Sequence, residues 1–193
     1  YSFLTSIPNM SVMAPKNLWE LRAMLDFAMD YNSPLAVRYP RGEAYRGLKE
    51  FRQPISYGVG EILYEEEDIA LLAVGSMVST GEHVRQKLKA EGYRCSLANG
   101  RFVKPFDRKM VSRLAKNHRL IVTMEENVLQ GGYGLAVTAF IHENYPEAKV
   151  LNIAIPDAYV EHGNVSILRE GLGIDSDSII RTMKAGGYIG KKD

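Results

Sequence analysis

The stretch Ile69-Ala70-Leu71-Leu72-Ala73-Val74, followed by Gly75-Ser76, determines the fold class that we predict for this chain. Its residues are apolar without interruption, instead of alternating between apolar and polar. A strand that is apolar on both faces is typical of a parallel sheet covered by helices on both sides. The runs Leu120 to Met124 and Val150 to Ile155 have the same character. We therefore predict an α/β fold with a three-layer, mostly parallel sheet.

Helix signals lie between these apolar runs, and a further strand is predicted from Tyr93 to Ala98. Strands that alternate with helices are typical of βαβ units, so residues 60–193 are predicted to form one domain. The predicted helices run from the capping pair Ser79 and Glu82 to Gly92, from Asp107 to Asn117, from Gly131-Gly132-Tyr133-Gly134 to Tyr145, from Asn164 to about Gly171, and from Asp175 to Ala185.

A smaller strand–helix–strand unit precedes this domain. Met10 to Ala14 and Leu35 to Tyr39 are short apolar runs that predict strands. Between them, Asn17 and Glu20 have the spacing of a capping box, which predicts a helix that ends at about Asp30. The order strand, helix, strand is the local pattern of a parallel sheet.

The segment between the two units is rich in glycine, proline and charged residues, which is typical of a linker. We therefore predict a first unit over residues 1–45, a linker over residues 46–59 and a main domain over residues 60–193. The chain opens on Tyr1-Ser2-Phe3-Leu4, which resembles sequence from the middle of a domain. We expect the chain to be a fragment of a longer protein.

The composition is that of an ordinary globular protein. Hydrophobic residues make up 46% of the 193 residues and charged residues 24%, which is enough for a substantial core. The near balance of 24 basic and 23 acidic residues argues against nucleic acid as a partner.

No apolar run approaches the length of a membrane span, and no secretory signal is present, so we expect a soluble, cytoplasmic protein. Cys95 is the single cysteine and is predicted to be a buried strand residue.

Two arginines follow the second predicted strand, in Ala36-Val37-Arg38-Tyr39-Pro40-Arg41-Gly42. A strand that breaks at proline and glycine brings its last side chains to the edge of a sheet, where open α/β proteins place their sites. A guanidinium group remains charged and presents a rigid set of donors that suits phosphate or carboxylate. Taken alone, Arg38 and Arg41 fit either an anion site or structural ion pairs with acidic neighbours.

Three other sets of residues are candidates for chemistry. The exposed amides of Gly131-Gly132-Tyr133-Gly134 could bind an anion, or the glycines could form a tight turn with close helix–sheet packing. Glu125 and Glu126 are adjacent on an extended chain and point to opposite sides, which favours an ion pair or a contact with a helix terminus over a shared proton. His83, His118 and His142 are predicted at solvated helix positions, and His162 on a loop after a strand. The histidines lack metal-ligand spacing, and we predict neither a metal site nor a complete catalytic set in this chain.

Five motifs, which span nearly the whole chain, carry a family resemblance. They are Ile7-Pro8-Asn9-Met10-Ser11-Val12-Met13-Ala14-Pro15, the arginine stretch Ala36–Gly42, Arg101-Phe102-Val103-Lys104-Pro105-Phe106-Asp107, Glu125-Glu126-Asn127-Val128 with Gly131-Gly132, and Pro156-Asp157 with Glu161-His162-Gly163. In this order they resemble the C-terminal third of the 1-deoxy-D-xylulose-5-phosphate synthase family, which belongs to the transketolase-like thiamine diphosphate enzymes.

The resemblance implies that residues 1–45 end a pyrimidine-binding domain and that residues 60–193 form a transketolase C-terminal domain. Members of the family are homodimers that condense pyruvate with D-glyceraldehyde 3-phosphate and release CO2, in the supply of isoprenoid, thiamine and pyridoxal precursors. The second arginine of the Arg-Tyr-Pro-Arg motif, here Arg41, helps to bind the substrate phosphate. Arg38, Tyr39 and His162 are expected beside the site. Arg38 lies at the opposite parity to Arg41 and before a proline, so we expect it to form a structural ion pair.

The family also requires thiamine diphosphate and Mg²⁺, whose glutamate and metal-binding motif are expected in the remainder of the same protein. This chain is therefore expected to bind neither cofactor alone and to be inactive alone. Two alternatives remain open. The chain could belong to a transketolase-like or 2-oxo-acid dehydrogenase β-type enzyme, or it could be an α/β binding module without catalysis.

Overall fold

The computed structural model describes residues 1–190 and contains a central five-stranded sheet. The strands are β3 (Glu61–Tyr64), β4 (Ile69–Ala73), β5 (Cys95–Asn99), β7 (Leu120–Val128) and β8 (Lys149–Ile155), in the spatial order β3-β5-β4-β7-β8. β4 is parallel to both β5 and β7, and β7 is parallel to β8, whereas β3 is antiparallel to β5. The predicted α/β fold with a mostly parallel sheet is confirmed. The short strand β3, which directly follows the residues predicted as a linker, was not predicted.

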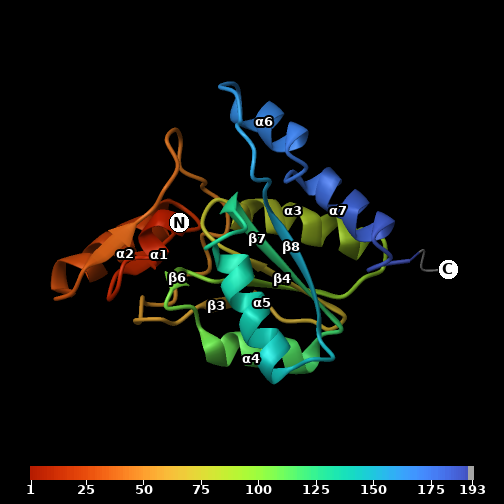
Figure 1. Cartoon of the computed structure of the whole chain (residues 1–193), viewed down its shortest axis with the longest axis horizontal. Coiled ribbons are helices and arrows are strands. Elements are labelled where there is room, and N and C mark those ends of the chain that lie inside the picture. Colours follow the sequence, from red (N-terminus) through yellow and green to blue (C-terminus); the bar gives the residue numbers. More distant parts are fainter. Residues whose placement is uncertain (191–193) are drawn as a thin grey trace.

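Helices cover both faces of this sheet, as the uninterrupted apolar strands required. They are α3 (Met77–Ala90), α4 (Arg108–Asn117), α5 (Tyr133–Asn144) and α7 (Ser176–Ala185). A further helix, α6 (Val165–Gly171), follows β8 and has no buried residue. In Figure 1, α3 and α7 lie on one side of the sheet and α4 and α5 on the other. Within β4, Ile69 and Leu71 pack into the α3–α7 core, while Ala70 and Leu72 pack into the α4–α5 core. All four side chains are fully buried.

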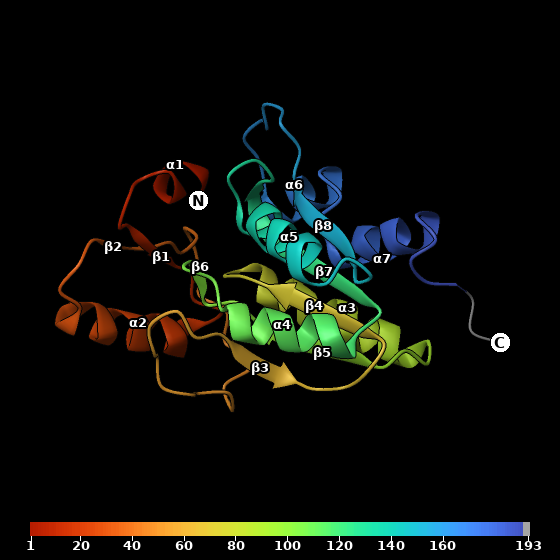
Figure 2. The ribbon, with the colours of Figure 1, turned by 60° about the horizontal axis from the view of Figure 1, so that its bottom comes forward.

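The first segment of the chain contains four elements. They are α1 (Ser2–Thr5), β1 (Ser11–Met13), α2 (Leu18–Asp30) and β2 (Leu35–Val37). β1 and β2 are parallel, in agreement with the predicted strand–helix–strand pattern. The other edge of β1 is occupied by β6 (Phe102–Lys104), which runs antiparallel to it and comes from the middle of the chain. Figure 2 shows these elements side by side at one end of the main sheet.

The two faces of β1 join the first segment to the rest of the molecule. Val12 packs into the α4–α5 core of the main sheet, whereas Met13 packs with Met24 of α2 and Phe102 of β6. All four residues are fully buried. The first segment therefore shares a hydrophobic core with the main domain.

The capping residues in the sequence predicted the start of α2 correctly but misplaced the start of α3. At α2, Asn17 Oδ1 accepts a hydrogen bond from the Glu20 amide at 3.0 Å, as the capping spacing predicted. α3 begins at Met77, one turn earlier than predicted, and Ser79 lies inside the helix, where its hydroxyl donates to the Ser76 carbonyl.

Within residues 1–190, no helix combines the length and the apolar character that a membrane span requires.

Candidate functional site

A cleft of about 800 Å³ lies between the first segment and the main domain. One wall is the loop after β2, which carries Arg38 and Arg41. The opposite wall contains Glu126, near the end of β7, and Arg169 of α6. β4 and β7 are parallel neighbours, so their carboxyl ends open at the same edge of the sheet. This edge is where open α/β sheets place their ligand sites.

Glu126 binds the two partly buried arginines of this cleft. Its Oε1 accepts from Nε and Nη2 of Arg169, each at 2.9 Å. Its Oε2 accepts from the Ser76 hydroxyl at 2.8 Å and from Nη1 and Nη2 of Arg38, each at 3.3 Å. Each carboxylate oxygen therefore holds a different arginine. The ion pair expected for one of the adjacent glutamates is present at Glu126.

The surroundings of Glu126 keep its carboxyl group ionised. Burial by itself would raise the pKa of Glu126. The charge of Arg169, the hydrogen bonds from Ser76 and Arg169, and the charge of Arg38 outweigh this effect, so the pKa lies below its usual value. Glu126 is therefore an anion under ordinary conditions and acts here as a fixed partner for arginine.

Arg41 differs from the other arginines of the cleft because it is unpaired. It is exposed, lines the cleft, and forms no hydrogen bond or ion pair with any other residue in the described range 1–190. The next residue, Gly42, has a φ of 118°, a conformation that favours glycine, so the chain turns sharply here. An unpaired guanidinium in a cleft is available to an anionic ligand.

The other two residues predicted beside the site lie in different places. Tyr39 lines the cleft and is 57% exposed. His162 lies in the exposed loop between β8 and α6 and is not part of the cleft lining. The structure therefore brings together Arg38, Tyr39 and Arg41, but not His162.

Glu125 points away from the cleft and caps the first turn of α5. Its two carboxylate oxygens accept from the amides of Tyr133 and Gly134 at 2.9 and 2.7 Å. Burial raises the pKa of Glu125, and these hydrogen bonds offset only part of that effect. The anion at the glycine-rich helix terminus is thus a side chain of the protein itself. The predicted contact of a glutamate with a helix terminus is confirmed at Glu125.

A second group of charges, which the sequence reasoning missed, joins the first segment to the main domain. Lys16 Nζ contacts Glu20 Oε1 at 2.9 Å and Glu61 Oε2 at 2.6 Å. Arg101 contacts the same two oxygen atoms, with Nε at 2.8 Å from Glu20 and Nη2 at 2.9 Å from Glu61. All four side chains are at most 2% exposed. The (i, i+4) spacing of Lys16 and Glu20 was the only local signal for this network.

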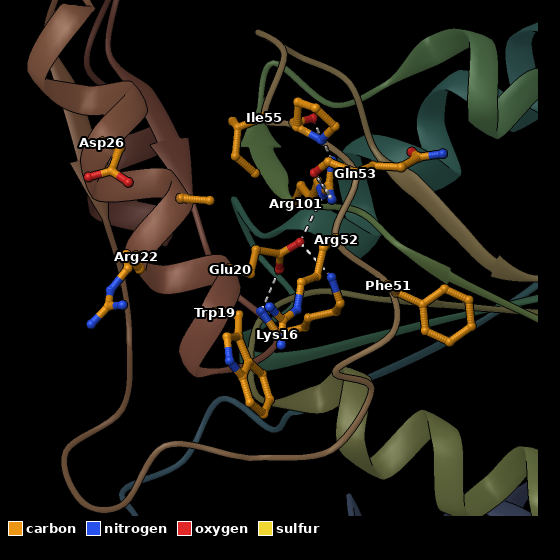
Figure 3. A pocket seen from close by; sticks show the side chains of 12 residues that line it. Lys16, Trp19, Glu20, Arg22, Asp26, Phe51, Arg52, Gln53, Ile55 and Arg101 are labelled. Atoms are coloured by element: carbon orange, nitrogen blue, oxygen red, sulfur yellow. Dashed lines mark hydrogen bonds and ion pairs between the residues drawn. The ribbon is translucent and has the colours of Figure 1, made fainter.

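A smaller cavity of about 270 Å³ lies over this network (Figure 3). Its outer rim includes Trp19 and Arg52, whose guanidinium carbon is 4.9 Å from the centre of the indole ring. At its floor, Glu20 is also bound by the Asn99 side-chain amide, which donates to both carboxylate oxygens at 2.9 Å. The polar groups at the floor already have partners, so the network is better suited to joining the two parts than to binding a ligand.

One histidine prediction was wrong. His118 follows α4 and is buried, with its ring within hydrogen-bond distance of the Ser96 hydroxyl and the Leu114 and Glu66 carbonyls. Helical periodicity could not show that the chain folds back over this position. His83 and His142 are exposed, as predicted, and Cys95 is buried in β5.

Residues 1–190 do not form a site for a divalent cation. Among residues 1–190, no group of three His, Cys, Asp or Glu side chains is placed to hold a metal ion. Glu126, one of the two carboxylates that line the cleft, is already bound to two arginines. The chemistry that this cleft can provide is the binding of an anion by arginine.

Comparisons with known proteins identify the family. Residues 58–179 match the family model described as transketolase, C-terminal domain. A 1-deoxy-D-xylulose-5-phosphate synthase of Lachnoclostridium phytofermentans is 47% identical over 180 residues, which are 93% of this chain and 29% of that protein. One of Aquifex aeolicus is 40% identical over 183 residues, 95% of this chain and 29% of that protein.

A solved structure described as a split gene transketolase, inactive beta4 tetramer, has a similar fold. Its TM-score is 0.87 at 25% identity, over 99% of this chain and 61% of that one. The chain thus spans less than a third of the two synthases and matches them along nearly its whole length. It belongs to the transketolase family and carries the C-terminal domain of that family.

Proposed function

We propose that this chain is the C-terminal part of a 1-deoxy-D-xylulose-5-phosphate synthase and that Arg41 binds the phosphate of D-glyceraldehyde 3-phosphate. The whole enzyme condenses this substrate with pyruvate and releases CO2. The similarity to synthases along nearly the whole chain supports this assignment over other members of the transketolase family.

The observation that carries the role of Arg41 is its unpaired guanidinium in the cleft at the carboxyl ends of the strands. Arg38 and Arg169 are already bound to Glu126, whereas Arg41 has no partner among residues 1–190. A charge-assisted contact with a phosphate is stronger than one between neutral groups, and a guanidinium can bind phosphate through two parallel hydrogen bonds. Arg41 is therefore the group most available to a phosphate that enters the cleft.

The isolated chain is expected to contribute one wall of an active site and to be inactive. Thiamine diphosphate supplies the carbanion chemistry of this family when it is bound, and the described residues hold no donor set for its Mg²⁺. The structural relative is itself described as inactive and as a tetramer, which supports inactivity and self-association of such a chain. We expect the complete protein to be a homodimer.

The test is steady-state kinetics of the longer protein that contains this chain, with both substrates varied. Arg41→Ala should raise the KM for glyceraldehyde 3-phosphate about ten- to a hundredfold, because a charge-assisted contact is worth about 1.5–3 kcal/mol. The KM for pyruvate should change little, since pyruvate has no phosphate. Arg41→Lys should recover only part of the loss, because an ammonium group retains the charge without the planar pair of donors.

Arg46→Ala is the matched control. Arg46 is exposed on the same loop but does not line the cleft, so its removal should leave both KM values unchanged. Equal effects of Arg41→Ala on both substrates would contradict the assignment of Arg41 to the phosphate. A panel of aldehyde acceptors would separate the proposed reaction from that of another transketolase-like enzyme.

A further inference from the structure

We propose that Arg169 of α6 is a second phosphate-binding residue of the cleft and that Glu126 is its positioning residue. This inference rests on the proposed function, because it assumes that the cleft receives a phosphorylated substrate. It adds a residue from the opposite wall, separated from Arg41 by most of the chain. The ligand class is a phosphate dianion, whose charge and oxygen atoms can satisfy more than one guanidinium group.

The hydrogen bonds of Arg169 leave one end of its side chain available. Nε and Nη2 both donate to Glu126 Oε1, and Nη1 has no partner within residues 1–190. The side chain is 22% exposed and lines the same cleft as Arg41. Arg169 can therefore donate to a ligand through Nη1 without releasing Glu126.

Glu126 determines where the guanidinium of Arg169 lies. α6 has no buried residue, and its Ile167 is 67% exposed, so hydrophobic packing of α6 against the sheet is weak. The ion pair between Arg169 and Glu126 connects α6 to the end of β7. The other carboxylate oxygen binds Arg38, so the negative charge of Glu126 also reduces repulsion between two neighbouring cations.

The charges that line the cleft favour an anionic ligand. Arg38, Arg41 and Arg169 contribute three positive charges, and Glu43 and Glu126 contribute two negative ones. The ammonium of Lys16, which also lines the cleft, is already bound by two buried carboxylates. The cleft therefore has an excess of positive charge, with the free donors on Arg41 and on Nη1 of Arg169.

The first experiment measures binding of inorganic phosphate to this chain by calorimetry, with sodium chloride at the same ionic strength as the reference. Arg169→Ala should weaken phosphate binding about tenfold, and Arg169→Lys should recover part of the loss. Glu126→Gln should also weaken binding, because the amide lacks the charge that fixes Arg169. Arg113→Ala is the matched control and should leave phosphate binding unchanged. Within residues 1–190, Arg113 pairs only with the exposed Glu65, outside the cleft.

The second experiment measures both KM values in the longer protein. Arg169→Ala should raise the KM for glyceraldehyde 3-phosphate and leave that for pyruvate unchanged, whereas a purely structural role would alter both or lower only the thermal midpoint. Wild-type affinity for phosphate in Arg169→Ala, together with weaker binding in Arg41→Ala, would overturn this inference and leave the proposed function in place. Weaker binding in Arg169→Ala but not in Arg41→Ala would support Arg169 and count against the proposed role of Arg41.

Discussion

Four buried charges lie at the junction between the first segment and the main domain, and the stability of the protein depends on each of them. Lys16 and Arg101 each contact both Glu20 and Glu61, and all four side chains are removed from water. A buried ion pair adds little net stability compared with apolar residues of the same shape, but removal of one member leaves its partners uncompensated. The network therefore makes the junction intolerant of substitution.

Arg101→Ala should lower the free energy of unfolding by about 3–5 kcal/mol, because Glu20 and Glu61 would share the single remaining cation, Lys16. Urea denaturation followed by circular dichroism measures this loss. Lys184→Met is the control: Lys184 pairs with Glu91 at 2.8 Å, but both side chains are more than 40% exposed. Its loss should cost at most about 1 kcal/mol. Similar losses for the two variants would show that the buried network has no special role.

At the scale of elements, the start of α5 is a tightly constrained point of the main domain. Gly132 precedes the helix, and a Cβ atom there would lie 2.5 and 2.6 Å from the carboxylate oxygens of Glu125 and 2.7 Å from the Val128 carbonyl. The glycine is therefore required because a carboxylate and the backbone approach it closely. The sequence of this segment fits either a tight turn or an anion site, and in the structure the turn is combined with a bound carboxylate, that of Glu125.

Gly132→Ala should destabilise the protein by about 1–3 kcal/mol, because the added methyl group forces Glu125 or the backbone to move. Gly171→Ala, at the end of α6, is the matched control, since a Cβ atom there would meet nothing within 4 Å. It should leave stability unchanged or raise it by up to about 1 kcal/mol, through helix propensity and a less flexible unfolded chain. Thermal unfolding of both variants tests the difference, and a Gly132→Ala protein as stable as the wild type would contradict the argument.

At the scale of the whole molecule, the first segment and the main domain are predicted to unfold together. β6 pairs with β1, Val12 lies in the α4–α5 core, and the buried charges cross the same junction. Unfolding of either part would expose apolar surface and unpaired charge on the other. Such mutual dependence is the basis of cooperative, two-state unfolding.

Trp19 provides a local probe for this prediction. It is the only tryptophan of the chain and lies on α2 in the first segment, whereas circular dichroism reports mainly on the helices of the main domain. The urea midpoints from tryptophan fluorescence and from circular dichroism should coincide. A fluorescence transition at clearly lower urea would show that the first segment unfolds independently.

Much of the fold could be predicted from local patterns because those patterns have local causes. The caps Asn17, Asp107, Asn164 and Asp175 each accept backbone hydrogen bonds at the helix starts where the sequence placed them. α3 was misplaced by a turn, because Ser76 provides no side-chain cap there. The strands β3 and β6 were missed because each is a short apolar run that includes a charged residue, Glu61 in β3 and Lys104 in β6.

The sequence by itself determined the layers of this protein, because strands that are apolar on both faces need helices on both sides. It also placed Arg41 on a loop at the end of a strand, where proline and glycine break the apolar run. Only the tertiary structure decided which charges meet. Arg38 and Arg169 lie 88 and 43 residues from Glu126, and Arg101 lies 81 residues from Glu20. Such contacts depend on how the strands are ordered and how the two units pack, which local propensity does not encode.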